Sequence, residues 1–268
     1  MKLEGKVAIV TGGARGMGRS HCLALAQEGA HIITFDICKD YPVDWPLGKK
    51  GELEETINQV LALGRRAVGL VADVSKGSEV KAVVDRAINE FGRVDILVNN
   101  AAVDFHYGPC HEVSEEDWEL MLNVNLKGPW LCCKYVIPQM MKQKSGKIIN
   151  ISSVCGRMGM PNVVPYTCSK HGVIGLTRAL AAELAPYKIN VNAICPGPVD
   201  TPMFSESARI IGVALKDAKE KWVENTVWRE LWQPQDISKA VVWLASEDSR
   251  FLTGHSLPAD GGWIGLLP

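Results

Sequence analysis

The sequence contains no run of roughly twenty apolar residues, the length that a helix needs to cross a membrane. An apolar start is missing too, because charged residues lie within the first seven positions, where a signal peptide would be apolar. Nor is there an excess of charge: 29 Lys and Arg stand against 30 Asp and Glu, a formal net charge of -1. These absences predict a cytoplasmic protein that neither enters a membrane nor binds a polyanion such as nucleic acid.

Pairs of cysteines or histidines at the spacing of metal ligands are also absent. The eight cysteines are dispersed, with no CxxC pair and no histidine pair of the zinc-site type. His106 and His111 have no array of Cys or carboxylate side chains around them in the sequence. We therefore expect free thiols and no metal site.

Composition and length indicate one ordinary globular domain. The 268 residues are 47% hydrophobic and 22% charged, which excludes a disordered chain or a fibrous repeat. No Ser- or Pro-rich linker divides the sequence. A single domain over residues 1–268 is expected.

Short apolar runs rich in β-branched residues alternate with segments of helical spacing. The expected strands are 6–11, 31–35, 66–71, 96–98, 147–151 and 189–194, and the expected helices are 15–28, 52–63, 80–91, 115–141 and 165–184. This alternation predicts an α/β fold with a parallel sheet. The strands are too apolar to face water on either side, as in a doubly wound sheet covered by helices on both faces.

Two stretches interrupt the alternation. Residues 37–51 contain Pro42, Pro46 and Gly48, and residues 196–233 follow the last long predicted strand. Long irregular segments in a compact α/β chain are commonly functional. Both are predicted to be functional insertions.

A glycine cluster, TGGARGMG at positions 11–18, joins the first expected strand to the first helix. Its glycines allow the backbone to approach a pyrophosphate whose charge the helix N-terminus stabilises, although a plain tight turn is an alternative. Asp36 ends the second strand, where a carboxylate binds the hydroxyls of an adenosine ribose and repels a 2'-phosphate. NAD is therefore expected rather than NADP, and Arg15 is the one feature of the loop that favours a phosphate.

Among the tyrosines, only Tyr166 has a lysine four residues further on. On a helix this spacing places Tyr166 and Lys170 on one face, although it also arises by chance on exposed helices. An ammonium near a phenol favours the phenolate, so Lys170 is expected to lower the pKa of Tyr166 and to allow proton exchange with an alcohol. Ser152 and Ser153 close the preceding strand at the carboxyl edge of the sheet, where such sheets bind ligands.

These motifs together resemble the short-chain dehydrogenase/reductase family over nearly the whole chain. The matching segments are Thr11–Gly18, Asp73-Val74, Asn99-Asn100-Ala101, Asn125, Ser153, the Tyr166/Lys170 pair and Pro196-Gly197. The resemblance implies a Rossmann-type sheet in a single domain, with a substrate lid at about 197–233 and an oxidoreductase activity that uses NAD.

The resemblance also implies a catalytic tetrad. Its members are Tyr166 as acid and base, Lys170 at the nicotinamide ribose, Ser153 at the substrate oxygen and Asn125 holding a water in a proton relay. Ser153 is preferred to Ser152 for its separation from Tyr166, and Asn125 to Asn123 because it precedes Leu126. Ser152 and Asn123 are the alternatives.

Cofactor contacts are implied in the same way. The expected set is Gly12, Arg15, Gly16, Met17, Gly18, Asp36, Ile37, Asp73, Val74, Asn100, Ala101, Tyr166, Lys170, Pro196, Gly197, Val199 and Thr201. Asp73 and Val74 belong at the adenine, and Val199 and Thr201 at the carboxamide. Ala102 departs from the glycine usual in the family, which matters little unless the backbone there needs a positive φ.

Within the family, the chain is most similar to the carveol-dehydrogenase-like, mycofactocin-associated members. The similarity lies in Asp36-Ile37-Cys38 with the following insertion, in ALGRR at 62–66 and in KHGV at 170–173. Such members often keep NAD tightly bound and pass its electrons to another carrier. The insertion 37–51 is expected beside the adenosine, where it is either a clasp or a plain surface loop.

Aromatic residues mark the expected lid. Trp222, Trp228 and Trp232, with Met203 and Phe204, predict a pocket for a bulky apolar alcohol, or alternatively a subunit contact. By position, Cys155, Cys168, His106 and Tyr107 are expected near the same pocket.

The sequence thus predicts an NAD-dependent enzyme that interconverts a secondary alcohol and a ketone on a hydrophobic, cyclic, terpenoid or steroid-like molecule. A 3-oxoacyl-acyl-carrier-protein reductase is a rival, disfavoured by Asp36 and by the lack of a basic docking surface. A dinucleotide-sensing regulator is a second rival, for which the tetrad would be superfluous. The resemblance further implies a homotetramer or a homodimer.

Overall fold

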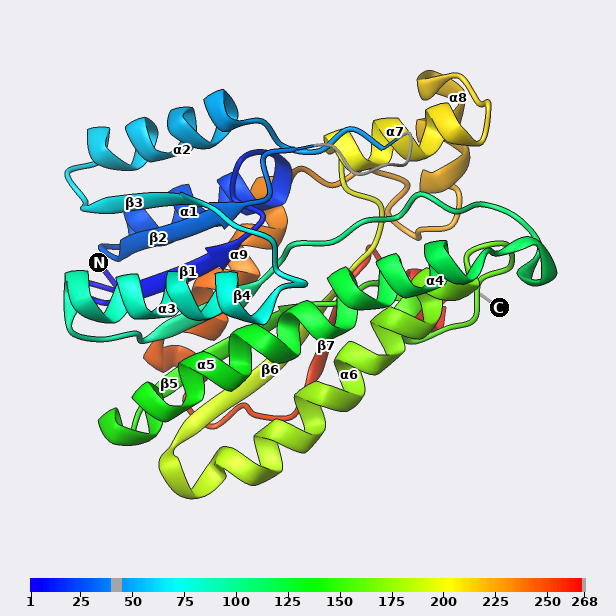
Figure 1. Cartoon of the computed structure of the whole chain (residues 1–268). Helices are drawn as coiled ribbons and strands as arrows, with labels where there is room; N and C mark the ends of the chain where they lie inside the picture. The colour runs from blue at the N-terminus through cyan, green and yellow to red at the C-terminus, as the bar shows by residue number, and fades with distance from the viewer. Residues whose placement is uncertain (40–44, 267–268) are drawn as a thin grey trace.

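Figure 1 shows the computed structural model, which describes residues 1–39 and 45–266. Its strands form one sheet in the order β3-β2-β1-β4-β5-β6-β7, with every neighbouring pair parallel. The strands are β1 (Val7–Thr11), β2 (His31–Asp36), β3 (Ala67–Val71), β4 (Ile96–Asn99), β5 (Gly146–Ile151), β6 (Ile189–Pro196) and β7 (Ser256–Ala259). The predicted α/β fold with a single parallel sheet is confirmed.

Helices cover both faces of the sheet (Figure 1). They are α1 (Gly16–Gln27), α2 (Lys50–Ala62), α3 (Gly77–Phe91), α4 (Glu115–Leu122), α5 (Gly128–Gln143), α6 (Val164–Leu184), α7 (Pro202–Ile210), α8 (Leu215–Val223), α9 (Pro234–Ala245) and α10 (Trp263–Leu266). Side chains of α3, α5 and α6 form one hydrophobic core against the sheet, and side chains of α1, α2 and α9 form the other.

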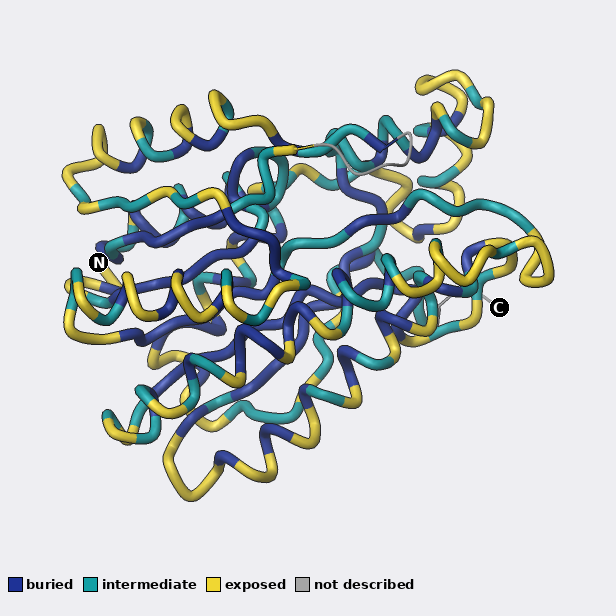
Figure 2. The backbone as a smooth tube through the Cα atoms, viewed as in Figure 1, coloured by how far each residue is buried: buried dark blue, intermediate teal, exposed yellow. Residues whose placement is uncertain are grey.

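Strand β1 shows why the strand sequences read as continuous apolar runs. Val7 and Ile9 enter the core beneath α3 and α5, whereas Ala8 and Val10 enter the core beneath α1 and α9. Successive side chains of a strand point to opposite faces, so a strand covered on both faces buries all of them. Figure 2 shows this central layer as a continuous buried band beneath helices with exposed outer faces.

Strand β3 corrects the expectation that every strand is covered on both faces. It lies at the edge of the sheet, where Gly69 is exposed and Val71 is 58% exposed. An edge strand has one neighbouring strand and only partial helical cover, so its apolar sequence does not guarantee burial.

The helix predicted over 115–141 is confirmed as a continuous helical stretch, in which a π-helical turn, Asn123–Lys127, lies between α4 and α5. Pro129 follows this turn directly and has no backbone N–H to donate, so it was an available signal for a local irregularity. Beyond residue 233, where no element was predicted, the structure adds α9 and β7.

The parallel strands place their carboxyl ends at one edge of the sheet. Thr11, Asp36, Asn99, Ile151 and Pro196 are the last residues of β1, β2, β4, β5 and β6. The chain crosses from one face to the other between β1 and β4, and open α/β sheets bind ligands at such a crossover. This edge therefore defines where the site must lie.

Candidate active site

The glycine loop packs too closely for a side chain at Gly13 or Gly18. Gly12 adopts a φ of +70°, and a Cβ atom on Gly18 would lie 1.9 Å from the Gly12 carbonyl oxygen. The loop leads into α1, whose N-terminus presents free backbone N–H groups at the edge of the sheet. The backbone is therefore shaped to receive a pyrophosphate.

Replacing Gly18 by Ala is expected to weaken cofactor binding at least tenfold and to lower the free energy of unfolding by about 1–3 kcal/mol, because the methyl group overlaps backbone that cannot move away. Gly51→Ala in α2 is the matched control, since a Cβ atom there meets nothing within 4 Å. Calorimetric titration with NAD and thermal melts measure both effects. Equal behaviour of the two variants would contradict the close packing.

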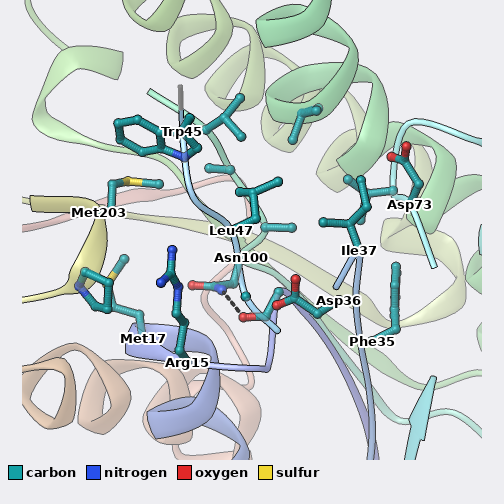
Figure 3. Close-up of a pocket in the computed structure, with 18 of the residues that line it drawn as sticks. Arg15, Met17, Phe35, Asp36, Ile37, Trp45, Leu47, Asp73, Asn100 and Met203 are labelled. Atoms are coloured by element: carbon teal, nitrogen blue, oxygen red, sulfur yellow. Dashed lines mark hydrogen bonds between the residues drawn. The ribbon is translucent and has the colours of Figure 1, made fainter. Parts of the chain in front are cut away.

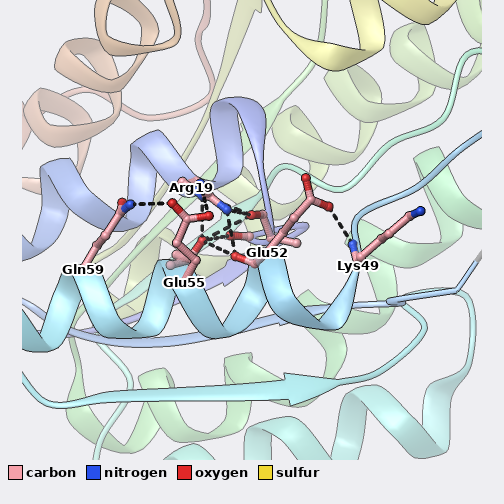
Figure 4. A network of polar contacts seen from close by, with 8 residues as sticks. Arg19, Lys49, Glu52, Glu55 and Gln59 are labelled. Atoms are coloured by element: carbon pink, nitrogen blue, oxygen red, sulfur yellow. Dashed lines mark hydrogen bonds and ion pairs between the residues drawn. The ribbon is translucent and has the colours of Figure 1, made fainter.

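Arg19 braces this loop from α1 (Figure 4). Its guanidinium donates to the carbonyl oxygen of Ala14 at 2.7 Å and to that of Glu52 at 2.8 Å, and it forms an ion pair with Glu55 at 3.0 Å. Thr56 of α2 adds a hydrogen bond from its hydroxyl to the Gly13 carbonyl at 2.9 Å. These hydrogen bonds hold helix α2 against the glycine loop.

Asp36 lies beside the loop at the rim of a cleft of about 130 Å³ (Figure 3). Its carboxylate accepts a hydrogen bond from the backbone N–H of Ala14 at 3.1 Å. Burial raises the pKa of Asp36, and the backbone N–H groups around it oppose that rise. The carboxylate is held in the orientation expected for a ribose-binding residue.

Asn100 closes the other side of this cleft. Its amide donates to the carbonyl oxygen of Thr11 at 3.0 Å, while its buried Oδ1 atom has no hydrogen-bond partner among the described residues. A buried amide oxygen normally has a partner, and this one has none within the described fold. The glycine cradle and Asp36 together fit the phosphates and ribose of a dinucleotide, and Asn100 lines the same cleft. Ala102 also lines the cleft and has no positive φ, so the departure from glycine carries no backbone strain.

The described part of the insertion 37–51 lies against the same cleft. Trp45 is 2% exposed and lines the cleft together with Leu47 and Gly48, and Arg15 donates to the Pro46 carbonyl oxygen at 2.6 Å. Arg15, which favoured a 2'-phosphate in the sequence, is therefore tied to the insertion. Residues 40–44 lie outside the described residues, and the last two positions belong to α2.

Tyr166 and Lys170 project from α6 toward the ends of β5 and β6. The Lys170 ammonium lies 5.4 Å from the centre of the Tyr166 ring and donates to the Ile151 carbonyl oxygen at 3.0 Å. Burial lowers the pKa of Lys170 to about 8, which the negative charge of Asp104 opposes.

The pKa of Tyr166 is not lowered in this structure, so the expectation drawn from the nearby Lys170 is wrong. Burial raises the pKa of Tyr166 above its ordinary value, and Asp104 raises it further, while a hydrogen bond with Ser153 lowers it. A buried phenolate loses its hydration, and the Lys170 ammonium is bonded to a carbonyl rather than to the phenol.

Ser152 and Ser153 make different contacts. Ser152 donates its hydroxyl proton to the Lys170 carbonyl at 2.9 Å and so joins β5 to α6. Ser153 accepts from the Cys155 backbone N–H at 3.2 Å and lines the same cavity as Tyr166. Ser152 lines this cavity as well, but Ser153 is the serine whose interaction lowers the pKa of Tyr166, which favours Ser153 as the residue that faces the chemistry.

Asn125 lies in the π-helical turn, and its side chain fixes the segment after β4. Its Oδ1 atom accepts from the Val103 N–H and its amide donates to the Val103 carbonyl, both at 2.8 Å. The side chain lies outside the lining of both cavities. Asn125 thus positions Val103, and its part in a water relay stays a prediction.

A second cavity, of about 550 Å³, adjoins the cofactor cleft. Its lining includes Met17, Asp104, Tyr107, Ser153, Cys155, Met160, Val163, Tyr166, Met203, Phe204, Ser207, Ile210, Ile211 and Trp222. Met17, Thr201 and Met203 line both cavities and so join them. The lining is largely apolar, as expected for a bulky apolar substrate.

The aromatic prediction for this cavity is correct in part. Trp222 lines it and packs edge to face on Phe204, with ring centres 5.4 Å apart. Trp228 does not: it is 65% exposed and stacks on Trp232, whose backbone bridges to Val199. These two side chains stack on each other outside the lining of the cavity.

Two of the four further residues predicted near the cavity line it. Cys155 and Tyr107 do so, whereas Cys168 is exposed and His106 lies 3.7 Å from Asp117. Cys168 follows Tyr166 by two positions, which places it on another face of α6.

The predicted cofactor residues fall into three groups. Gly12, Arg15, Met17, Asp36, Ile37, Asp73, Val74, Asn100, Ala101 and Thr201 line the cleft, and Tyr166, Pro196, Gly197 and Val199 line the adjoining cavity. Gly16, Gly18 and Lys170 line neither. The two glycines shape the backbone, and Lys170 is buried behind Tyr166.

Asp104 is the residue that sequence reasoning missed. It is buried in the larger cavity, and its Oδ2 atom accepts from the Tyr107 hydroxyl at 2.6 Å. Burial raises the pKa of Asp104 to about 6, while the Tyr107 hydrogen bond and the Lys170 charge lower it. Its position shortly after β4, at the carboxyl edge of the sheet, was the available signal.

All eight cysteines are free thiols, as predicted. Across residues 1–39 and 45–266, no helix has the length and apolar character needed to span a membrane.

Comparison with known proteins agrees with this geometry. A model of the family described as short chain dehydrogenase matches residues 6–210. The (-)-trans-carveol dehydrogenase of Rhodococcus erythropolis is 38% identical over 97% of this chain and 98% of that protein. A 3-oxoacyl-acyl-carrier-protein reductase of Thermotoga maritima is 35% identical over 98% of this chain and 100% of that protein.

Solved structures extend the likeness to three dimensions. The crystal structure of carveol dehydrogenase from Mycobacterium avium in complex with NAD is 38% identical, with a TM-score of 0.93, and covers 98% of this chain and 99% of that one. The resemblance drawn from the motifs, including that to carveol dehydrogenases, is confirmed. The chain belongs to the short-chain dehydrogenase/reductase family and is an oxidoreductase of the kind that works with a dinucleotide cofactor.

Proposed function

We propose that the protein is an NAD-dependent dehydrogenase that interconverts a secondary alcohol and a ketone on a hydrophobic, cyclic substrate of terpenoid or steroid-like shape. One observation carries the proposal: a largely apolar cavity, with Ser153 and Tyr166 in its wall, adjoins the cleft of Asp36 and the glycine loop. Bound NAD supplies the hydride acceptor at this junction.

The residues divide the chemistry between them. Tyr166 donates its phenolic proton to a ketone oxygen or, as phenolate, removes the proton of an alcohol. Ser153 holds the same substrate oxygen by a hydrogen bond. Lys170, which donates to the Ile151 carbonyl, supplies positive charge behind the phenol. Asn125 holds Val103 in the wall of the cofactor cleft.

Preference for NAD over NADP rests on Asp36. Its carboxylate is fixed by the Ala14 N–H, and Arg15 is tied to Pro46 rather than free to bind a phosphate. A 2'-phosphate at this position would meet a fixed negative charge.

Tight retention of NAD is part of the proposal. Trp45 and Leu47 close over the cleft, and the Arg15 bond to Pro46 fastens the insertion to the glycine loop. This arrangement supports the clasp over the plain surface loop. Opening it breaks apolar contacts, which slows cofactor release.

Oligomerisation completes the proposal. A homotetramer or homodimer is consistent with exposed aromatic side chains such as Trp130 on α5 and Trp228 after α8. An acyl-carrier-protein reductase is the weaker alternative, because Asp36 disfavours NADP and the cavity lining is largely apolar.

Two measurements on the purified protein test the function. The absorbance spectrum and mass of any co-purifying small molecule are recorded first, and a panel of cyclic secondary alcohols is then assayed with added NAD and, separately, with an artificial electron acceptor. We expect co-purifying NAD and turnover of cyclic alcohols. Loss of NAD on gel filtration overturns the clasp, and activity confined to acyl thioesters with NADPH overturns the proposed function.

A further inference from the structure

The lid helices α7 and α8 have a small hydrophobic core of their own. Phe204 and Ala208 of α7 pack with Ala218 of α8 in a cluster that is separate from the two cores against the sheet. Because so few apolar side chains are buried there, this core stabilises the lid only slightly. The contacts that join the lid to the rest of the chain therefore determine where its side chains lie.

Trp222 of α8 is in contact with both the substrate cavity and the C-terminal segment. Its ring lines the larger cavity and packs edge to face on Phe204. The same ring packs edge to face on Trp263 of α10, with ring centres 6.2 Å apart and ring planes at 88°. Trp263 itself lines neither the larger cavity nor the cofactor cleft. Any influence of Trp263 on a substrate must therefore pass through Trp222.

Trp263 is held in place by the sheet rather than by the lid. Asp260 directly follows β7, which pairs with β6, and is 6% exposed. Its carboxylate accepts from the backbone N–H groups of Gly262 at 3.1 Å and Ile264 at 2.8 Å. Hydrogen bonds to a charged acceptor are stronger than those between neutral groups, so the backbone on both sides of Trp263 is firmly fixed.

The other contacts between the lid and the body of the protein involve the lid backbone or exposed charges. The backbone N–H of Val227 donates to the Gly261 carbonyl oxygen at 2.9 Å. Lys219 of α8 forms an ion pair with Asp200 at 2.7 Å, in which both side chains are about one-third exposed, and such a pair contributes little to stability. The depth of the Trp222 ring in the cavity wall therefore depends on the rings packed against it.

We propose that Trp263 is a positioning residue that sets the width of the substrate cavity by holding the Trp222 ring in its wall. This inference rests on the proposed function, because it describes the size limit of the same site. Removal of the Trp263 side chain leaves a space behind Trp222 into which that ring can retreat. The cavity then fits a small ring less closely and accepts a larger one.

The test compares oxidation of cyclohexanol with that of the fused bicyclic alcohol decahydro-2-naphthol by the full-length protein with added NAD. In Trp263→Ala, KM for cyclohexanol is expected to rise roughly 3- to 10-fold while kcat changes less than about twofold, because an aromatic contact of ordinary strength is lost and the acid-base group is not. KM for the bicyclic alcohol should stay the same or fall, so that selectivity shifts toward it.

Further variants separate this role from general support of the fold. Trp263→Phe keeps an aromatic partner for Trp222 and should restore most of the original selectivity. Trp243→Ala is the matched control, because Trp243 lies on α9, is 38% exposed and lines neither cavity. In a Trp222→Ala background, removal of Trp263 should cause no further change in selectivity. Circular dichroism checks folding, and Trp263→Leu decides the matter should Trp263→Ala not fold.

Amide hydrogen exchange measures the same contact without a substrate. Exchange in α8 is expected to be about 3- to 10-fold faster in Trp263→Ala than in the unaltered protein, and unchanged in Trp243→Ala. Unchanged selectivity in Trp263→Ala, an equal shift in Trp243→Ala, or faster exchange throughout the chain would each overturn the inference. If the unaltered protein oxidises no cyclic alcohol, the proposed function fails, and exchange in α8 alone then decides whether Trp263 holds Trp222.

Discussion

Replacing Tyr166 by Phe is expected to lower kcat for alcohol oxidation by about 100- to 10,000-fold, the range that general acid and base groups contribute. NAD affinity should change less than about threefold, because the phenolic oxygen serves the substrate rather than the main cofactor contacts. Steady-state kinetics and calorimetric titration with NAD measure the two quantities. Tyr107→Phe is the matched control, since it removes a phenol from the same cavity.

The pH dependence checks the same assignment from another side. Burial and Asp104 both raise the pKa of Tyr166, so the phenolate needed for oxidation becomes more abundant as pH rises above neutral. Oxidation should therefore accelerate with pH, whereas ketone reduction, which needs the phenol, should not. Turnover retained in Tyr166→Phe, or oxidation that slows as pH rises, would sink the assignment.

Replacing Asp36 by Asn should shift the ratio of kcat/KM for NAD to that for NADP by about 100- to 1,000-fold toward NADP. The substitution removes a negative charge that would face a 2'-phosphate, and such a pair close to a protein surface repels by about 4 kcal/mol. The Asn oxygen can still accept from the Ala14 N–H, so the loop should keep its shape.

Asp85→Asn controls for net charge, because Asp85 is exposed on α3 and pairs only with Lys81 among the described residues. Kinetics with both cofactors decide between two roles for Asp36. A proportional fall for NAD and NADP would mean that Asp36 merely braces the glycine loop, and the proposed cofactor preference would then be wrong.

The sequence by itself determined which strand ends and which helix carry the polar residues of the candidate site. Gly18, Asp36 and Tyr166 with Lys170 follow the ends of apolar strands or share a helix face, and parallel strands bring such ends to one edge whatever the remaining packing. Local spacing and hydrophobic period therefore sufficed to predict the sheet, the place of the cleft and the position of Tyr166 and Lys170 on one face of a helix. The exposure of strand β3 at the sheet edge and the π-helical turn at Asn125 were not predicted, because neither a position in a sheet nor a side-chain hydrogen bond to Val103 is a local property.

Only the tertiary structure determined which side chains line the larger cavity and in which direction their pKa values are shifted. Trp222 lines that cavity while Trp228 faces out, although both lie in the same predicted lid. Asp104 acquires its partners from Tyr107 and, through it, from Ser207, which lies 100 residues beyond Tyr107 in the chain. Burial, pKa and an unpaired acceptor depend on which distant groups the fold brings together, and no pattern of neighbouring residues encodes them.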